Sequence, residues 1–277
     1  MAIYWFSIFD RTIRINCDDT EMNNLVLGVY GSMQVSEEQA TFPPDIDYVL
    51  SRTDREGEMY CIERLGEKAI YSDDDGLFIY LLEKDMTIEL EVQRSDLYFL
   101  HAAALEYKNN IHLLIAESGG GKSTTAWALL HHGFNYSSDE LAPVELKDMT
   151  ILRYPHALNQ KTHPPEPYPL PSNTITTSRT MHVPTDSLPC MLTSKPLELS
   201  SIFFVQYDSS NVEPSIQDVS SGEATARIYA NGLNQLAHEA DGLAAAAQIA
   251  LHAKCFHLNT ASLDKTAELV KSFLDKL

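Results

Sequence analysis

Hydrophobic and polar positions change their pattern near residue 95. Before it, short runs rich in aromatic and β-branched residues alternate with polar segments, which is typical of strands. We expect strands at residues 4–15, 48–53, 58–65 and 77–82, forming an antiparallel sheet in a small N-terminal α+β domain over residues 1–95. The sequence SDDDG at residues 72–76 lies between two of these runs and predicts a hairpin turn.

Strands and helices alternate after residue 95, which predicts an α/β domain over residues 96–277. The segment SDLYFLHAAALEY is amphipathic or buried, and the apolar run at 111–115 predicts a central strand. A glycine cluster follows, and then a helix from Ser123 to His132 that stops at Gly133. Further along we expect strands at 134–136, 202–205 and 255–258, and helices from residue 222, at 243–253 and at 263–274.

Prolines mark one exceptional stretch of this second domain. Nine of the thirteen lie between Pro155 and Pro196. Because proline lacks a backbone N–H, the stretch predicts neither a helix nor a central strand. It is either an ordered excursion or a mobile loop, and long insertions of this kind are often lids or binding loops.

Charge and composition narrow the classes of function. The chain of 277 residues has a formal net charge of −19 and no basic patch, which argues against nucleic acid as a partner. No apolar run approaches the roughly 18 residues of a membrane span, and the start of the chain lacks a basic leader. Four widely spaced cysteines suggest neither disulfides nor a zinc site. We therefore expect a protein of the reducing cytoplasm that does not act on a membrane.

The strongest chemical motif is AESGGGKS, from Ala116 to Ser123, a P-loop pattern with alanine in place of its first glycine. Glycines let backbone N–H groups turn toward an anion, and the following helix adds the positive end of its dipole. In this pattern Lys122 reaches the β- and γ-phosphates of ATP and the Ser123 hydroxyl binds Mg²⁺. The expected nucleotide-binding residues are Glu117, Ser118, Gly119, Gly120, Gly121, Lys122, Ser123 and Thr124. The alternative, an ordinary glycine turn before a helix, gives no reason for a lysine followed by a serine at positions 122 and 123.

A second candidate group, Asp139 and Glu140, follows the expected strand at 134–136. Two carboxylates at a strand end can divide the work, Asp139 near Mg²⁺ and one of the pair accepting a proton from an attacking hydroxyl. Without a P-loop nearby, such a pair is more often a solvated loop or a helix N-cap. His101 taken alone is more often structural than catalytic, and Asp208 is an alternative metal-binding acid after the strand at 202–205.

Together these residues resemble the catalytic domain of HPr kinase/phosphorylase, which phosphorylates a serine of a carrier protein. That family places a histidine before a G-x-S-G-x-G-K-S loop, then a helix ending in glycine, then a strand leading into an acidic pair. The corresponding elements are His101, the P-loop, Gly133 and Asp139-Glu140. The resemblance is close over residues 96–145 and looser to the end of the chain, where CFHLNTASLDKTAELVKSFL is similar to the strand and helix that close related kinase domains.

The resemblance implies a P-loop kinase domain of HPr-kinase type, with His101, Lys122, Asp139 and Glu140 as catalytic residues. In the family the second acid of the pair accepts the proton, and Glu140 takes that place here. The extra methylene of glutamate shifts the carboxylate by about a bond length, so Asp139 can share or assume the role. The family's later arginine-containing signature and metal-binding glutamate are absent from this sequence, which weakens the case for the same substrate and for reverse phosphorolysis. Similar kinases of the wider superfamily phosphorylate a serine of ribosomally made peptides.

Three functions follow from these observations. The first is an ATP- and Mg²⁺-dependent kinase acting on a serine hydroxyl of a protein or peptide. The second keeps the chemistry but takes a small alcohol or sugar as acceptor. The third is a nucleotide-binding regulator with little turnover. Members of the family form ring-shaped oligomers, so the resemblance also implies a homo-oligomer for this chain. No feature of its own sequence indicates one.

Overall fold

The computed structural model describes residues 2–277 and has a mixed α/β fold with six α-helices over that part of the chain. Its residues form two compact units. The first comprises Met1–Gln93, Pro155–His163 and Leu170–Ser187; the second comprises Arg94–Tyr154, Pro164–Pro169 and Leu188–Leu277. The chain passes between them close to the expected boundary at residue 95. Much of the proline-rich stretch, however, belongs with the first unit, whereas the sequence pattern places it in the second.

The first unit is built on a six-stranded sheet with the order β3-β1-β2-β4-β5-β6. Its strands are β1 (Ala2–Ile8), β2 (Arg11–Cys17), β3 (Gln34–Val35), β4 (Ile46–Arg52), β5 (Tyr60–Arg64) and β6 (Ile70–Ser72). The run at 4–15 is a hairpin of β1 and β2, turned at Phe9 and Asp10, which both have positive φ. Because β2 pairs in parallel with β4, the expectation of a purely antiparallel sheet is wrong at that pair.

Helix α2 (Asp75–Gln93) replaces two expected features, the hairpin turn at 72–76 and the strand at 77–82. The Asp74 carboxylate accepts a hydrogen bond from the backbone N–H of Leu77 at 2.7 Å, so the acidic run starts a helix rather than a turn. Its buried apolar residues recur at helical spacing: Phe78, Ile79, Leu82, Met86 and Leu90. The window at 77–82 was too short to distinguish this period from a buried strand.

Helix α1 (Thr20–Tyr30) was also missed from the sequence. Asp19 begins it, because its carboxylate accepts a hydrogen bond from the backbone N–H of Met22 at 2.9 Å. The proline-rich residues of this unit form a small three-stranded sheet with the order β13-β15-β14. Its strands are β13 (Leu158–Gln160), β14 (Ile175–Thr176) and β15 (Met181–Val183). The stretch is therefore an ordered excursion in this structure.

The second unit has a nine-stranded sheet with the path β10-β8-β9-β16-β12-β11-β7, to which β18 is added beside β16 and β17 beside β18. The strands are β7 (Leu97–Leu100), β8 (Ala103–Tyr107), β9 (Asn110–Ile115), β10 (Asn135–Ser138), β11 (Ala142–Glu145), β12 (Thr150–Ile151), β16 (Leu197–Tyr207), β17 (Ser215–Asp218) and β18 (Lys254–Thr260). The expected strands at 111–115, 202–205 and 255–258 are confirmed within β9, β16 and β18, and the one at 134–136 overlaps β10, which begins at Asn135. The segment before the P-loop forms β7 and β8.

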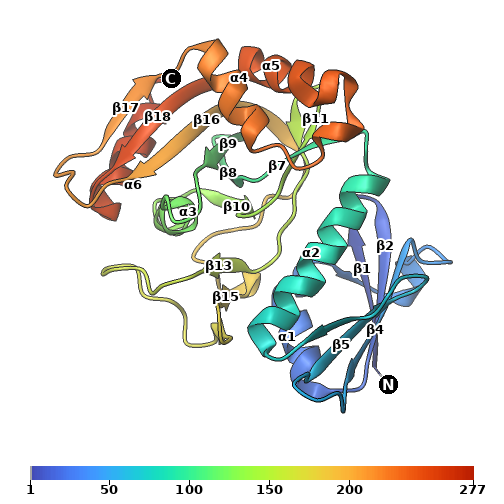
Figure 1. The fold of residues 1–277 in the computed structure, drawn as a ribbon. Coiled ribbons are helices and arrows are strands. Elements are labelled where there is room, and N and C mark those ends of the chain that lie inside the picture. The colour runs from blue at the N-terminus through green and yellow to red at the C-terminus, as the bar shows by residue number, and fades with distance from the viewer. Residues whose placement is uncertain (1) are drawn as a thin grey trace. The chain divides into compact units, whose positions relative to one another are not determined.

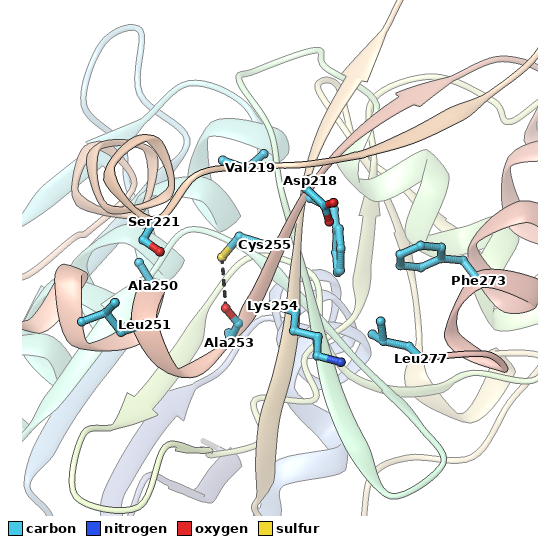
Figure 2. Close-up of a pocket in the computed structure, with 11 residues that line it drawn as sticks. Asp218, Val219, Ser221, Ala250, Leu251, Ala253, Lys254, Cys255, Phe273 and Leu277 are labelled. Carbon is cyan, nitrogen blue, oxygen red and sulfur yellow. Dashed lines mark hydrogen bonds between the residues drawn. The ribbon is translucent and has the colours of Figure 1, made fainter.

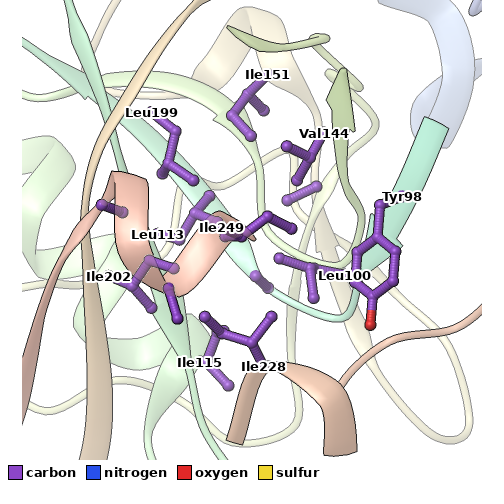
Figure 3. Packing of buried hydrophobic residues seen from close by; sticks show 14 of the residues in the cluster. Tyr98, Leu100, Leu113, Ile115, Val144, Ile151, Leu199, Ile202, Ile228 and Ile249 are labelled. Atoms are coloured by element: carbon purple, nitrogen blue, oxygen red, sulfur yellow. The ribbon is translucent and has the colours of Figure 1, made fainter. Parts of the chain in front are cut away.

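Four helices cover the two faces of this sheet (Figure 1). They are α3 (Lys122–His131), α4 (Ser221–Ala230), α5 (Leu243–His252) and α6 (Leu263–Leu274), so the expected helices are confirmed. Alternate strand residues face opposite layers. Leu113 and Ile202 pack in a core with Ile228 of α4 and Ile249 of α5 (Figure 3), whereas Phe203 turns to the ring of Phe273 on α6.

The remaining helical segments are short 3₁₀ turns at Gly31–Met33, Glu37–Gln39, Thr185–Ser187, Gln235–Ala237 and Glu239–Gly242. Within residues 2–277, no helix combines the length and the apolar character needed to cross a bilayer.

Glu91 on α2 gives a pH-dependent test of the first unit. Its side chain is buried, and burial raises the pKa of Glu91 from 4.5 to about 7. The folded state therefore loses stability, relative to a neutral side chain, as pH rises from 4.5 to 7. We predict that Glu91→Gln raises the free energy of unfolding at pH 8 by about 1–3 kcal/mol, and that the gain disappears below pH 4.5. Urea unfolding at several pH values checks this, with exposed Glu63→Gln as control; an equal gain at every pH would contradict it.

Candidate functional site

Strand order brings four separate segments to one edge of the second sheet. β9 and β16 are parallel, and β10 runs in the same direction as β9 because each is antiparallel to β8, which lies between them. The carboxyl ends of these three strands, and the start of β8, therefore share an edge. The glycine loop follows β9, the acidic pair follows β10, and His101 precedes β8. Ligands of open α/β sheets commonly bind at such an edge.

The glycine loop has the backbone that an anion cradle requires. Gly119 and Gly121 have φ angles of 81° and 90°, in the left-handed region that favours glycine. A Cβ on Gly120 would lie 3.0 Å from the carbonyl oxygen of Glu117, and the Gly120 N–H already donates to that oxygen at 2.8 Å. Ala116 is not among the described residues with positive φ. Alanine therefore meets the position of the motif's first glycine without backbone strain.

Helix α3 begins at Lys122, with Gly121 as its N-cap. Its first turn contains Ser123 and Thr124, which are partly buried. Because the free backbone N–H groups of a helix point out of its N-terminus, they and the positive end of the dipole face the loop. This local positive end is what an anionic ligand needs in a chain with a net charge of −19. Glu117 and Ser118, which precede the helix in the loop, are exposed to solvent.

The Lys122 ammonium lies against the acidic turn after β10. Its Nζ donates a hydrogen bond to the carbonyl oxygen of Asp139 and lies 3.5 Å from Oε2 of Glu140. The same Oε2 is 2.9 Å from Nε2 of His101. The four residues expected to be catalytic are therefore brought together, although they come from three separate segments of the chain.

The two carboxylates of the pair have different surroundings. Asp139 is 0% exposed, and its Oδ1 accepts a hydrogen bond from the Tyr136 hydroxyl at 3.0 Å. The Glu140 side chain is 35% exposed and the His101 side chain 40% exposed. A reactant from solvent can thus reach Glu140, whereas Asp139 is held inside the unit. Tyr136 was not identified from the sequence, because the four residues of β10, NYSS, do not indicate which side chain turns toward Asp139.

Mg²⁺ at a P-loop takes one or two protein ligands together with phosphate oxygens and water. Ser123, on α3, carries a hydroxyl, and Asp139 carries a carboxylate. Asp139 lies in the turn after β10, to which Lys122 of α3 is hydrogen-bonded. In residues 2–277, no group of three or more His, Cys, Asp or Glu side chains is arranged to hold a metal ion. Hydroxyl and carboxylate oxygens are ligands that magnesium prefers, so Ser123 and Asp139 are the candidate protein ligands.

Other residues of this edge take different roles. The Asp208 carboxylate, after β16, accepts hydrogen bonds from the backbone N–H and the hydroxyl of Ser210, at 2.8 Å and 2.7 Å, which makes it part of a local turn. Tyr207, which sequence reasoning missed, is 57% exposed beside the P-loop: its Cβ would lie 3.4 Å from a Cβ placed on Gly121. Its position at the end of a strand parallel to β9 was the signal that could have identified it.

His131 and His132 end α3, as the sequence suggests, but they also bind a residue of the proline-rich stretch. Nε2 of His132 is 2.8 Å from the Tyr168 hydroxyl, and the indole N–H of Trp127 donates to the Tyr168 carbonyl oxygen at 3.0 Å. The His131 ring packs at 5.3 Å from that of Tyr168. These contacts attach residues 164–169 to the helix that follows the P-loop.

A pocket of about 630 Å³ lies elsewhere in the same unit, between the start of β18 and the ends of α5 and α6 (Figure 2). Lys254 and Phe273 are among its lining residues. Because β18 and β9 are both parallel to β16, the start of β18 lies at the end of the sheet opposite the P-loop. This pocket is therefore not part of the candidate site.

No protein-family model matches this chain, and no curated protein sequence matches it. Among solved structures, the chain is similar to the Hpr(Ser) kinase/phosphatase from Coxiella burnetii, with 12% sequence identity and a TM-score of 0.32. The match covers 64% of this chain and 97% of that one. A similarity of this size does not assign a function, so the proposals that follow depend on the residues of the site.

Two buried tyrosines give a matched test of the acidic turn. Tyr136 and Tyr98 are both 0% exposed, but the Tyr98 hydroxyl has no hydrogen-bond partner among the described residues. We predict that Tyr136→Phe lowers the free energy of unfolding by about 1.5–3 kcal/mol, because a bond to a buried carboxylate is lost. Tyr98→Phe should be neutral or stabilising. Urea unfolding of both variants checks this, and equal effects would contradict the assigned role of Tyr136.

Proposed function

We propose that the second unit binds ATP with Mg²⁺ at residues 117–124 and transfers the γ-phosphoryl group to a serine-type hydroxyl of a protein or peptide. The observation that carries this proposal is the convergence of Lys122, Glu140 and His101 beside a glycine loop of P-loop geometry. A glycine turn with a purely structural role gives no reason for a lysine, a carboxylate and a histidine to meet at its helix.

Each residue has a distinct part in the reaction. Backbone N–H groups of the loop and the start of α3 bind the phosphates, and Lys122 moves from the Asp139 carbonyl oxygen to the β- and γ-phosphates. Ser123 and Asp139 would hold the magnesium ion, which would supply charge neutralisation on the phosphate oxygens. Glu140 accepts the proton of the attacking hydroxyl, because it is the exposed acid of the pair. His101 orients the Glu140 carboxylate through the contact at 2.9 Å.

The exposure of Glu140 and His101 favours a large acceptor over a small one. Both side chains are more than a third open to solvent, with His101 40% and Glu140 35% exposed. A hydroxyl on a protein or peptide can approach them from outside. An enzyme for a small alcohol or sugar more commonly encloses its acceptor to exclude water. That reaction, and nucleotide binding without turnover, are the alternatives that the next experiment separates.

Substitutions at Lys122 and Glu140 test binding and chemistry separately. We predict that Lys122→Ala weakens Mg²⁺·ATP binding at least about tenfold, because a charge-assisted contact to phosphate is lost. Glu140→Gln should bind Mg²⁺·ATP within about twofold of the unchanged protein but transfer phosphate about 10²–10⁴-fold more slowly, the usual effect of losing a general base. Calorimetry measures binding, and transfer of labelled phosphate from ATP to a serine-peptide library measures turnover.

Two exposed residues of the same unit serve as controls. Lys254→Ala removes a lysine at the opposite end of the sheet, and Glu198→Gln removes an exposed carboxylate on β16; neither should change binding or transfer. Unchanged turnover in Glu140→Gln would overturn the base assignment. Normal ATP binding in Lys122→Ala would overturn the P-loop assignment, and tight binding with no transfer to peptides or small alcohols would favour a nucleotide-binding regulator.

A further inference from the structure

The segment that follows β12 is hydrogen-bonded to both strands that flank the turn with the acidic pair, β10 and β11. The backbone N–H of Leu152 donates to the carbonyl oxygen of Pro143, and that of Tyr154 donates to the carbonyl oxygen of Ser137, both at 3.0 Å. These two acceptors flank the turn on either side. Arg153 lies between the two donors in the chain, so its backbone is held beside the strands that enter and leave the turn.

The Arg153 side chain is held near β10 but not in the core. Tyr154 is 1% exposed, whereas Arg153 is exposed, as the alternation of an extended chain requires. Its Nη1 donates to the carbonyl oxygen of Thr193 at 3.3 Å. Thr193 in turn donates its backbone N–H to the carbonyl oxygen of Tyr136 at 2.8 Å. The neighbouring residue Tyr154 is thus hydrogen-bonded to β10, and the Arg153 guanidinium is hydrogen-bonded to Thr193, which itself binds β10.

Arg153 also differs from the other arginines of the second unit. Arg94 pairs with Asp96, and Arg227 pairs with Glu223. Arg153 has no carboxylate partner among the described residues, although the chain carries 39 acidic residues and only 20 basic ones. A guanidinium has five N–H donors, of which one is used here. A tethered arginine with free donors suits an anionic ligand, above all a phosphate, which it can bind with two parallel hydrogen bonds.

We infer that Arg153 binds the γ-phosphoryl group of ATP, as a second cation in addition to Lys122. This inference rests on the proposed function. In the transfer, the acceptor oxygen forms a bond to the γ-phosphorus, and the bond from that phosphorus to the β,γ-bridging oxygen breaks. The electron pair leaves with ADP, and the acceptor proton passes to Glu140. Arg153 neutralises charge on the phosphoryl oxygens throughout and remains bound to them when they reach the acceptor.

Nucleotides that differ by the γ-phosphoryl group test the inference without a known acceptor. Calorimetry compares the Kd of a non-hydrolysable ATP analogue with that of ADP, both with Mg²⁺. We expect Arg153→Gln to weaken binding of the analogue about tenfold or more, because a charge-assisted contact is lost, and to change binding of ADP by less than about twofold. Arg153→Lys, which keeps the charge but not the paired donors, should fall between.

The matched control is Arg227→Gln, which removes the same charge from the same unit at a paired arginine; it should change neither Kd. Because Arg153 is exposed, its variants should keep the melting temperature of the unchanged protein, and Arg153→Lys serves if Arg153→Gln does not fold. Equal weakening of both nucleotides, or no weakening of either, would overturn the inference alone. Failure of the unchanged protein to bind either nucleotide would instead overturn the proposed function, and the inference with it.

Discussion

The hydrogen bond from Lys122 to the carbonyl oxygen of Asp139 is the contact on which the site depends. It joins the start of α3, and with it the glycine loop, to the turn after β10. Lys122 is only 8% exposed, so its ammonium group needs compensation for lost hydration. The Asp139 carbonyl oxygen and the Glu140 carboxylate at 3.5 Å provide it. Under the proposed function, phosphate oxygens would replace these partners, so the buried ammonium group would remain paired with negative oxygens throughout.

That bond is possible only because of the strand register beneath it. Ala103 pairs with Leu114 on β9, and Ala104 pairs with Ser138 on β10. These pairs bring the ends of β9 and β10 to the same level on either side of β8. A slip of one residue would turn every side chain of a strand to the opposite face, and would separate His101 from Glu140. The fully buried core of Leu113, Ile202 and Ile249 resists such a slip, because it would place apolar side chains in the wrong layer.

Local features of this protein were predictable from sequence, and non-local ones were not. The glycine loop, β9, α5 and α6 depend on neighbouring residues, so a motif or a helical period identified them. Helix α2 was misread because six residues do not distinguish a strand from one face of a helix. The partnership of Tyr136 with Asp139, and the position of the Arg153 segment beside β10, depend on how strands pair. The assignment of the proline-rich residues to two units depends on contacts between segments far apart in the chain, which no short pattern records.

The central claim is that backbone N–H groups of the glycine loop bind nucleotide phosphate, and amide NMR tests it most directly. Titration with Mg²⁺·ADP reports each N–H group separately, without a known acceptor and without a substitution. The account predicts that the largest shifts occur at Gly119, Gly121 and Lys122, with smaller changes at the acidic turn as Lys122 leaves the Asp139 carbonyl oxygen. Saturable shifts confined to other parts of the chain, such as the pocket beside Lys254, would contradict it.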